Sequence, residues 1–231
     1  GNVFYIDDST VPNLTATAIN EMTTNPLLIG VKQAAGFTVL PGFLSAFDFE
    51  RPVPYENAPQ YSGTDYVQNS NNSYWLTNLN APITGVSPLY GAVDNQQSLR
   101  SRMAHTLLAD SAGSDGLFSP IEVEQALLSN RSYLAENILT ELLVICQAQG
   151  NTAVTVGAES VDISAGCTAL SLWDGKMNTG SSSAHLFREF AFLFAQNPQW
   201  TNSFSSSAAT TTPSGLVSNT TTLTQFAQAI L

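Results

Sequence analysis

Apolar residues recur every three or four positions through the second half of the chain. Leu99, Met103 and Leu107 have this spacing, which places them on one face and predicts a helix over 96–109. The same reasoning, with capping residues at helix starts and a glycine after one helix end, extends to the other helices. They are expected over 120–128, over 131–149, from Ser160 or Asp162 to Trp173, from Ser183 past Phe194, and over 223–230.

Two of these helices carry additional signals. Ser119 followed by Pro120 is typical of a helix start, because serine accepts hydrogen bonds from free N–H groups and proline fits the first turn. In the helix after Ser183, apolar side chains such as Phe187 and Phe190 nearly surround the axis. We therefore expect this helix to be deeply buried.

The first third of the chain has a different pattern. The run Val3-Phe4-Tyr5-Ile6 predicts a strand over 2–7, and a strand so close to the first residue needs neighbours to pair with. We therefore expect the chain to be a piece of a longer polypeptide. Short helices are expected over 16–22 and 27–35, irregular segments over 45–63, 82–88 and 201–222, and a strand or extended linker over 151–156.

These elements predict an α+β fold that is predominantly helical. Its strand-containing part is residues 1–95, and residues 96–231 form a helical region with a Ser/Thr-rich loop near the C-terminus. The chain has 231 residues, of which 43% are hydrophobic, enough to bury one good core or two small ones.

Composition removes several classes of function. No stretch approaches the roughly 18 uninterrupted apolar residues of a membrane span. The net charge of −11 lacks the basic footprint that nucleic-acid binding requires, so we expect neither a membrane nor a nucleic-acid partner. Charged residues are only 11% of the chain, and the surface must therefore be rich in Ser, Thr, Asn and Gln, a pattern that favours an exported protein.

The residues that commonly bind metals or act in catalysis are few. Cys146 and Cys167 cannot make a structural zinc site alone, and they are either a disulfide or two buried thiols. His105 and His185 lie within helical patterns and are interpreted as packing or helix-end residues rather than members of a Ser-His-Asp triad. The acids Asp7, Asp8, Asp48 and Glu50 are interpreted as capping groups. We expect no metal and no cofactor.

One polar cluster stands between a β-rich run and a tryptophan. Residues 65–78 read DYVQNSNNSYWLTN, with three asparagines and two serines before Tyr74 and Trp75. Such a cluster is either an ordinary Asx-rich turn or a loop that aims one carboxamide at a reacting group.

This block resembles the penicillin acylase family of N-terminal nucleophile hydrolases, in particular its branch of acyl-homoserine lactone and aculeacin A acylases. The resemblance begins with GNVFY at residue 1, followed by Asp7 and Val11-Pro12, and runs in order to about residue 195. The N-S-N-[ND]-S-Y-W-L block is the most specific part. SLRSR at 98–102, CTALSLWD at 167–174 and LFREF at 186–190 support it.

The resemblance implies a fragment of an αββα β-chain, with residues 1–95 as the part of the catalytic sandwich that carries the Asn71 loop. In that family a serine at the start of the β-chain attacks an amide, and its own α-amino group, which titrates near neutrality, accepts the hydroxyl proton. Asn71 matches the family's oxyanion-hole donor, with Asn69, Asn72 and Ser73 holding its loop. The family's paired cysteines match Cys146 and Cys167, which favours the disulfide.

The sequence also departs from the family pattern. The nucleophilic serine should precede residue 1, since Gly1 has no side chain. Where the family has a helper arginine this chain reads Asp94-Asn95-Gln96-Gln97, and neither Arg100 nor Arg102 can be given that role from the sequence. The calcium ligands of the penicillin G branch have no clear counterparts.

The expected function is therefore that of one part of an acylase. The complete enzyme, with an α-chain and the N-terminal part of the β-chain as partners, would cleave N-acylated small molecules such as acyl-homoserine lactones or acylated antibiotics. It would be periplasmic or secreted, and this chain alone would be inactive. The alternative is a non-catalytic binding or structural domain from a degenerate homologue.

Overall fold

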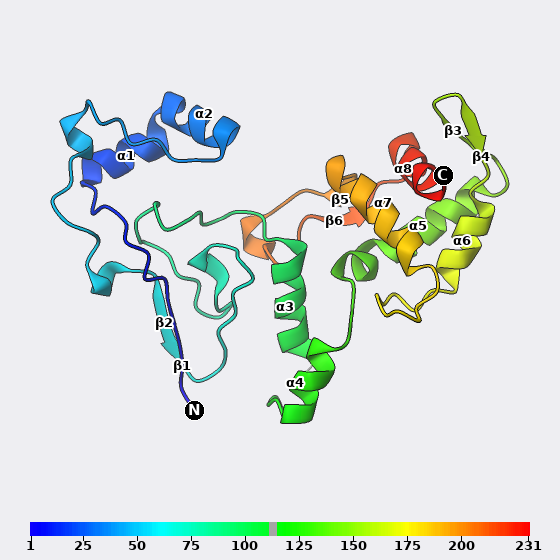
Figure 1. Ribbon diagram of the computed structural model, residues 1–231, viewed down its shortest axis with the longest axis horizontal. Coiled ribbons are helices and arrows are strands. Elements are labelled where there is room, and N and C mark those ends of the chain that lie inside the picture. The colour runs from blue at the N-terminus through cyan, green and yellow to red at the C-terminus, as the bar shows by residue number, and fades with distance from the viewer. Residues whose placement is uncertain (111–114) are drawn as a thin grey trace. The chain divides into compact units, whose positions relative to one another are not determined.

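The computed structural model describes residues 1–110 and 115–231. The chain divides into two compact units, Gly1–Asn95 and Gln96–Leu231 (Figure 1). The described residues are mostly helical, and their strands form small two-stranded sheets. This agrees with an α+β fold in which helices predominate.

The first unit holds one antiparallel sheet and a small helical core. Its elements are β1 (Val3–Ile6), α1 (Ala16–Thr24), α2 (Pro26–Ala35), β2 (Gln60–Gly63) and three 3₁₀ helices, η1 (Ser45–Phe47), η2 (Tyr55–Asn57) and η3 (Tyr74–Leu76). Strands β1 and β2 pair with Tyr5 opposite Tyr61. A side chain caps each α-helix, because Thr15 accepts from the Ala18 N–H and Asn25 from the Leu27 N–H.

The second unit contains the larger core. Its elements are α3 (Leu99–Asp110), α4 (Pro120–Leu127), α5 (Tyr133–Gln149), β3 (Val154–Val156), β4 (Glu159–Val161), α6 (Ser164–Ser171), α7 (Ala184–Gln196), β5 (Trp200–Asn202), η4 (Ser206–Ala208), β6 (Ser214–Leu216) and α8 (Thr220–Ile230). The strands pair locally, β3 with β4 and β5 with β6.

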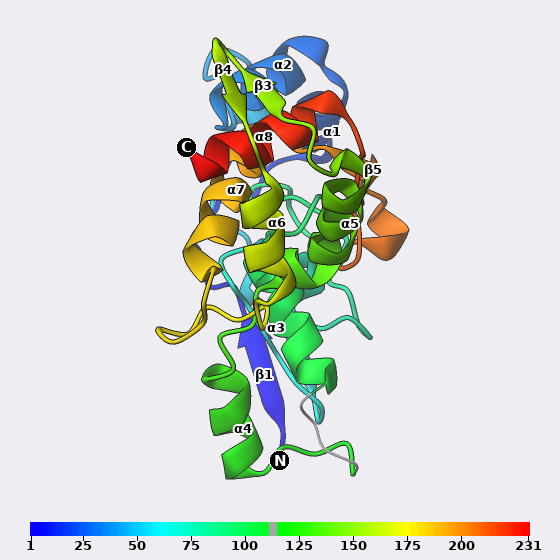
Figure 2. The same ribbon diagram turned by 90° about the vertical axis from the view of Figure 1, so that its right-hand side faces the viewer.

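Helix α7 supplies the centre of this core. Phe187, Phe190 and Phe194 are buried along one face, and the Phe190 ring meets the ring of Phe226 on α8 edge to face at 5.8 Å. Figures 1 and 2 both show α7 and α8 side by side. Phe192 on the opposite face is 65% exposed, so the helix is amphipathic. The sequence predicted a deeply buried helix with apolar side chains nearly all round it, and the exposed face shows that this prediction was wrong.

Two segments expected to be irregular contain regular structure. Residues 45–63 include the strand β2, and residues 201–222 include part of β5, all of β6 and the start of α8. Helix α8 begins at Thr220, three residues earlier than expected, because the Asn219 side chain accepts from the Thr222 N–H and caps it.

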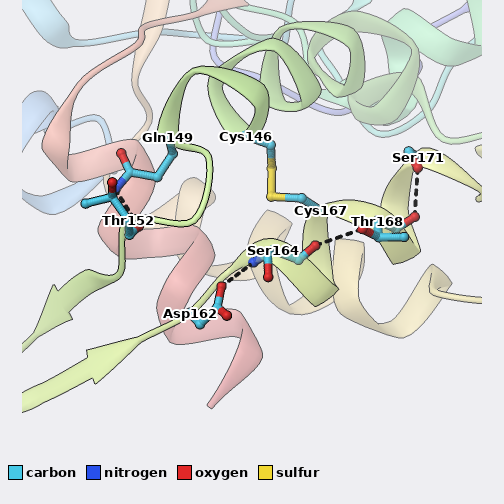
Figure 3. Close-up of a disulfide and its surroundings, with 8 residues drawn as sticks. All are labelled: Cys146, Gln149, Thr152, Asp162, Ser164, Cys167, Thr168 and Ser171. Carbon is cyan, nitrogen blue, oxygen red and sulfur yellow. Dashed lines mark hydrogen bonds between the residues drawn. A yellow bond between two sulfur atoms is a disulfide. The ribbon is translucent and has the colours of Figure 1, made fainter.

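A disulfide joins the end of α5 to the middle of α6. The Cys146 and Cys167 sulfur atoms are 2.05 Å apart, and the two cysteines are 21 positions apart in the sequence (Figure 3). Close to the disulfide, Asp162 accepts from the Ser164 N–H at 2.9 Å, which orders the start of α6. The disulfide that the family resemblance favoured is present.

Helix α4 begins with strong local signals yet buries nothing. Ser119 and Glu122 form a reciprocal capping box, and Pro120 occupies the first turn. No residue of α4 is buried, and Leu127 is 77% exposed. Within the described residues, no helix is long and apolar enough to cross a membrane.

Candidate functional site

The asparagine cluster forms a closed loop on a buried base. The Gln68 N–H donates to the Thr77 carbonyl at 3.0 Å and joins the two arms of the loop. Tyr74, Trp75 and Leu76 of η3, which come directly before Thr77, are all buried. The apolar half of the block is therefore an anchor, and its polar half is held at the surface of the first unit.

At the tip, the three asparagines have different roles. The Asn69 side chain accepts from the Asn71 backbone N–H at 2.8 Å, which is an Asx turn, and donates to the Asn72 carbonyl at 3.2 Å. Asn71 is exposed and adopts a left-handed backbone conformation with φ 62°. Asparagine tolerates that region better than most residues do.

The far side of the loop rests against residues 91 and 92. The Ser73 hydroxyl donates to the Ala92 carbonyl. A Cβ on Gly91 would lie 2.8 Å from the Ser73 Cβ, so only glycine allows this close approach. The loop is thus fixed by its neighbours as well as by its own turn.

Tyrosines and one carboxylate surround the base of the loop. Burial raises the pKa of the Tyr5 hydroxyl, and the charge of Asp7 raises it further, with smaller opposing contributions from the side chains of Thr77 and Asn69. Burial and Asp7 likewise raise the pKa of Tyr74. Both phenols are therefore neutral at physiological pH.

Asp65 and Asn78, at the two ends of the loop, form a hydrogen-bonded group with Tyr61. Asp65 accepts from the Tyr61 hydroxyl at 2.6 Å and from the Asn78 carboxamide at 2.8 Å. The bond from Tyr61 is the main reason that the pKa of Asp65 is held well below its ordinary value. Sequence reasoning missed this group; the signal available was that Asp65 and Asn78 are the first and last residues of the recognised block.

Arg102, one of the two arginines downstream of the asparagine block, belongs to the second unit. It is fully buried in the second unit, where its side chain donates to the carbonyls of Thr210 and Pro213. Its role there is to hold backbone segments together. Arg100 on the same helix is exposed.

The remaining residues singled out from the sequence have different local settings. His105 is buried on α3, and His185 is exposed in the first turn of α7. Asp7 caps a turn, since it accepts from the Ser9 N–H at 3.0 Å. Over residues 1–110 and 115–231, no group of three or more His, Cys, Asp or Glu residues could hold a metal ion.

Comparison with known proteins gives consistent matches. The penicillin amidase family matches residues 1–230. Aculeacin-A acylase from Actinoplanes utahensis is 34% identical over 206 residues, which cover 82% of this chain and 26% of the relative. The acyl-homoserine lactone acylase PvdQ from Pseudomonas fluorescens strain Pf0-1 is 34% identical over 161 residues, 68% of this chain and 19% of the relative.

A further PvdQ, from Pseudomonas syringae pv. tomato, is 28% identical over 224 residues, which cover 94% of this chain and 28% of the relative. The chain therefore spans about a quarter of the length of the curated relatives that it matches.

Proposed function

The chain belongs to the penicillin amidase family, and from this premise we propose that it is one part of a larger amidohydrolase that cleaves the amide bond of N-acylated small molecules. Its candidate substrates are acyl-homoserine lactones and acylated antibiotics, because the names of its relatives include acyl-homoserine lactone and aculeacin A. The attacking serine would belong to polypeptide outside this chain.

In the proposed reaction the serine hydroxyl attacks the amide carbonyl carbon, and the serine's own α-amino group takes the hydroxyl proton. Negative charge then develops on the carbonyl oxygen. The protonated α-amino group then gives this proton to the leaving nitrogen, the C–N bond breaks and the amine departs; water afterwards attacks the acyl-enzyme, which releases the acid and restores the serine hydroxyl. A neutral donor aimed at the oxyanion lowers the barrier to both steps, and such a donor is what this chain would supply.

The Asn71 loop is the single observation that carries this proposal. The backbone N–H of Asn71 donates to Asn69, and the group that we assign to the oxyanion is the Asn71 carboxamide. The residue is exposed at the tip of a loop with a buried base, in an uncommon backbone conformation. Conformations of this kind cluster at functional sites, where surrounding structure maintains them.

Exposed apolar side chains support the view that this is part of a larger protein. Leu27 on α2 is 72% exposed and Leu127 on α4 is 77% exposed. Neither helix buries a single residue, and isolated helices of 8 or 10 residues are marginal in water. Coverage of only about a quarter of the relatives' length leaves ample polypeptide to pack on these faces.

We also propose a periplasmic or secreted location. The support is the disulfide between Cys146 and Cys167, since disulfides persist mainly in oxidising compartments.

The test is Asn71→Ala in the complete, matured parent protein, assayed on a panel of acyl-homoserine lactones and an acylated antibiotic such as aculeacin A. We expect kcat to fall about 10²–10³-fold, as when an oxyanion donor is lost in other acyl-transfer enzymes. KM should change little, because the interaction strengthens only in the transition state.

Asn151→Ala is the matched control, because Asn151 is an exposed asparagine in the second unit. It should keep full turnover. Equal turnover of the Asn71→Ala and Asn151→Ala proteins would remove Asn71 from the reaction. Absence of hydrolysis in the parent protein itself would favour a non-catalytic homologue.

A further inference from the structure

The two ends of the asparagine loop are tied by a buried carboxamide. Asn78 is fully buried, and its Nδ2 donates to Asp65 Oδ2 at 2.8 Å and to the Tyr66 carbonyl at 2.9 Å. Its Oδ1 accepts from the Asn80 N–H at 2.8 Å. One side chain therefore connects the residues that enter the loop to those that leave it.

The other carboxylate oxygen connects this tie to the sheet. Asp65 Oδ1 accepts from the Tyr61 hydroxyl at 2.6 Å, and Tyr61 lies on β2 directly opposite Tyr5 of β1. The Tyr61 ring folds over Gly63, where a Cβ would lie 2.1 Å from the hydroxyl oxygen. A larger residue at Gly63 would displace the hydroxyl from Asp65.

The Asp65 carboxylate stays ionised at neutral pH, so it keeps its hydrogen bonds from Tyr61 and Asn78 there. Its pKa is held well below the ordinary value, first by Tyr61 and then by Asn78, so it is ionised at neutral pH. Hydrogen bonds to an ionised acceptor are the stronger kind. Tyr61, Asp65 and Asn78 together form a loop clamp.

We propose that the loop clamp sets the position of the Asn71 carboxamide and that Asp65 is a positioning residue for the reaction. The proposal rests on the oxyanion role proposed for Asn71. Loops whose ends are free sample many orientations, and a displacement of about 1 Å in a catalytic group can cost as much as 10²-fold in rate. The clamp fixes the exit direction of both arms, and the Gln68–Thr77 bond closes the arms above it.

The experiment is a double-mutant cycle between Asp65→Ala and Asn71→Ala in the complete, matured enzyme. Asp65 is exposed, so its loss should leave the protein folded. We expect Asp65→Ala to lower kcat about 10-fold or more with KM within about 2-fold, because the misplaced donor weakens a hydrogen bond that matters mainly in the transition state. In the Asn71→Ala background, Asp65→Ala should change kcat less than about 2-fold, since there is no donor left to misplace.

Two further variants separate positioning from general stability. Asp65→Asn keeps one acceptor oxygen for either Tyr61 or Asn78, and it should recover part of the lost kcat. Gly63→Ala leaves Asp65 and Asn78 unchanged but displaces the Tyr61 hydroxyl, and it should lower kcat in the same way in a cycle with Asn71→Ala. This variant also tests the clamp if Asp65→Ala does not fold. Asp48→Ala, at an exposed aspartate of the same unit, should leave kcat unchanged.

The outcomes distinguish the two proposals. Full turnover of Asn71→Ala would overturn the role of Asn71, and the clamp's role would fall with it. A large loss in Asn71→Ala, together with an equal effect of Asp65→Ala in both backgrounds, would overturn the clamp alone. A change in KM without a change in kcat would also overturn it.

Discussion

Arg102 lies over the ring of Tyr133, with its guanidinium carbon 4.5 Å from the ring centroid. The same side chain donates through Nε to the Thr210 carbonyl at 2.9 Å and through Nη1 to the Pro213 carbonyl at 3.0 Å. The Tyr133 hydroxyl also donates to Thr210. A buried cation therefore joins α3, α5 and the segment before β6 by a cation–π contact and charge-assisted hydrogen bonds.

Replacement of this arginine should weaken the second unit substantially. Arg102→Ala removes the donors to two carbonyls and leaves a cavity, and we expect the free energy of unfolding to fall by about 3 kcal/mol. Urea denaturation followed by tryptophan fluorescence measures the change. Arg188→Ala is the control, because the Arg188 side chain is 74% exposed, and it should cost less than about 0.5 kcal/mol. Similar losses in both variants would contradict the role of Arg102.

The sequence predicted the helices of this fold better than its strands. The helix starting at Pro120 was predictable, because the Ser119 cap and the proline are local signals that the structure uses in the expected way. The strand β2 was not, because it is only 4 residues long and pairs through Tyr61 with Tyr5, more than fifty positions earlier. Long-range pairing of short strands leaves little local periodicity.

The candidate site shows the same division. The cluster around Asn71 could be found because its residue types and order are unusual. The tie between Asp65 and Asn78 was harder to find: both residues end the recognised block, but no local pattern shows that the carboxamide is fully buried against a carboxylate thirteen positions away. Arg102 was equally hidden, because its partners Thr210 and Pro213 lie more than a hundred positions along the chain.

The loop clamp should make the first unit sensitive to acid. The pKa of Asp65 is lowered in the folded state from its ordinary value of 3.8, mainly by Tyr61. A group with a depressed folded pKa contributes stability that is fully present above its unfolded pKa and is lost as the pH falls through the folded pKa. We therefore expect the contribution to decline below about pH 4. Thermal unfolding between pH 7 and pH 2 measures it.

Asp65→Asn provides the comparison for that measurement. The variant cannot ionise at this position, so its unfolding temperature should fall less steeply below pH 4 than that of the unmodified protein. Parallel pH profiles for the two proteins would show that the clamp carboxylate is not the group responsible. Asp48→Asn, at an exposed site, should follow the unmodified protein.

The disulfide should contribute measurable stability to the second unit. It joins Cys146 and Cys167 across a sequence separation of 21, and the chain-entropy relation gives about 3 kcal/mol for a loop of this size. Denaturation with and without a reducing agent, and of the Cys146→Ala/Cys167→Ala double variant, measures the contribution. The double variant should be insensitive to the reducing agent, and an equal response to reduction in both proteins would contradict this assignment.

Helix α4 should respond to substitution only in the complete protein. Leu127 is 77% exposed on a helix that buries nothing, so Leu127→Gln should change the unfolding free energy of the 231-residue chain by less than about 0.5 kcal/mol. If the rest of the acylase covers this face, as proposed, the same change should cost the complete enzyme about 1.5–3 kcal/mol, the value of burying a leucine side chain. Glu124→Gln, at an exposed position of the same helix, should be neutral in both. Equal, small effects of Leu127→Gln in the chain and in the complete enzyme would mean that this apolar face stays in water, and the covering of α4 would then no longer support a larger assembly.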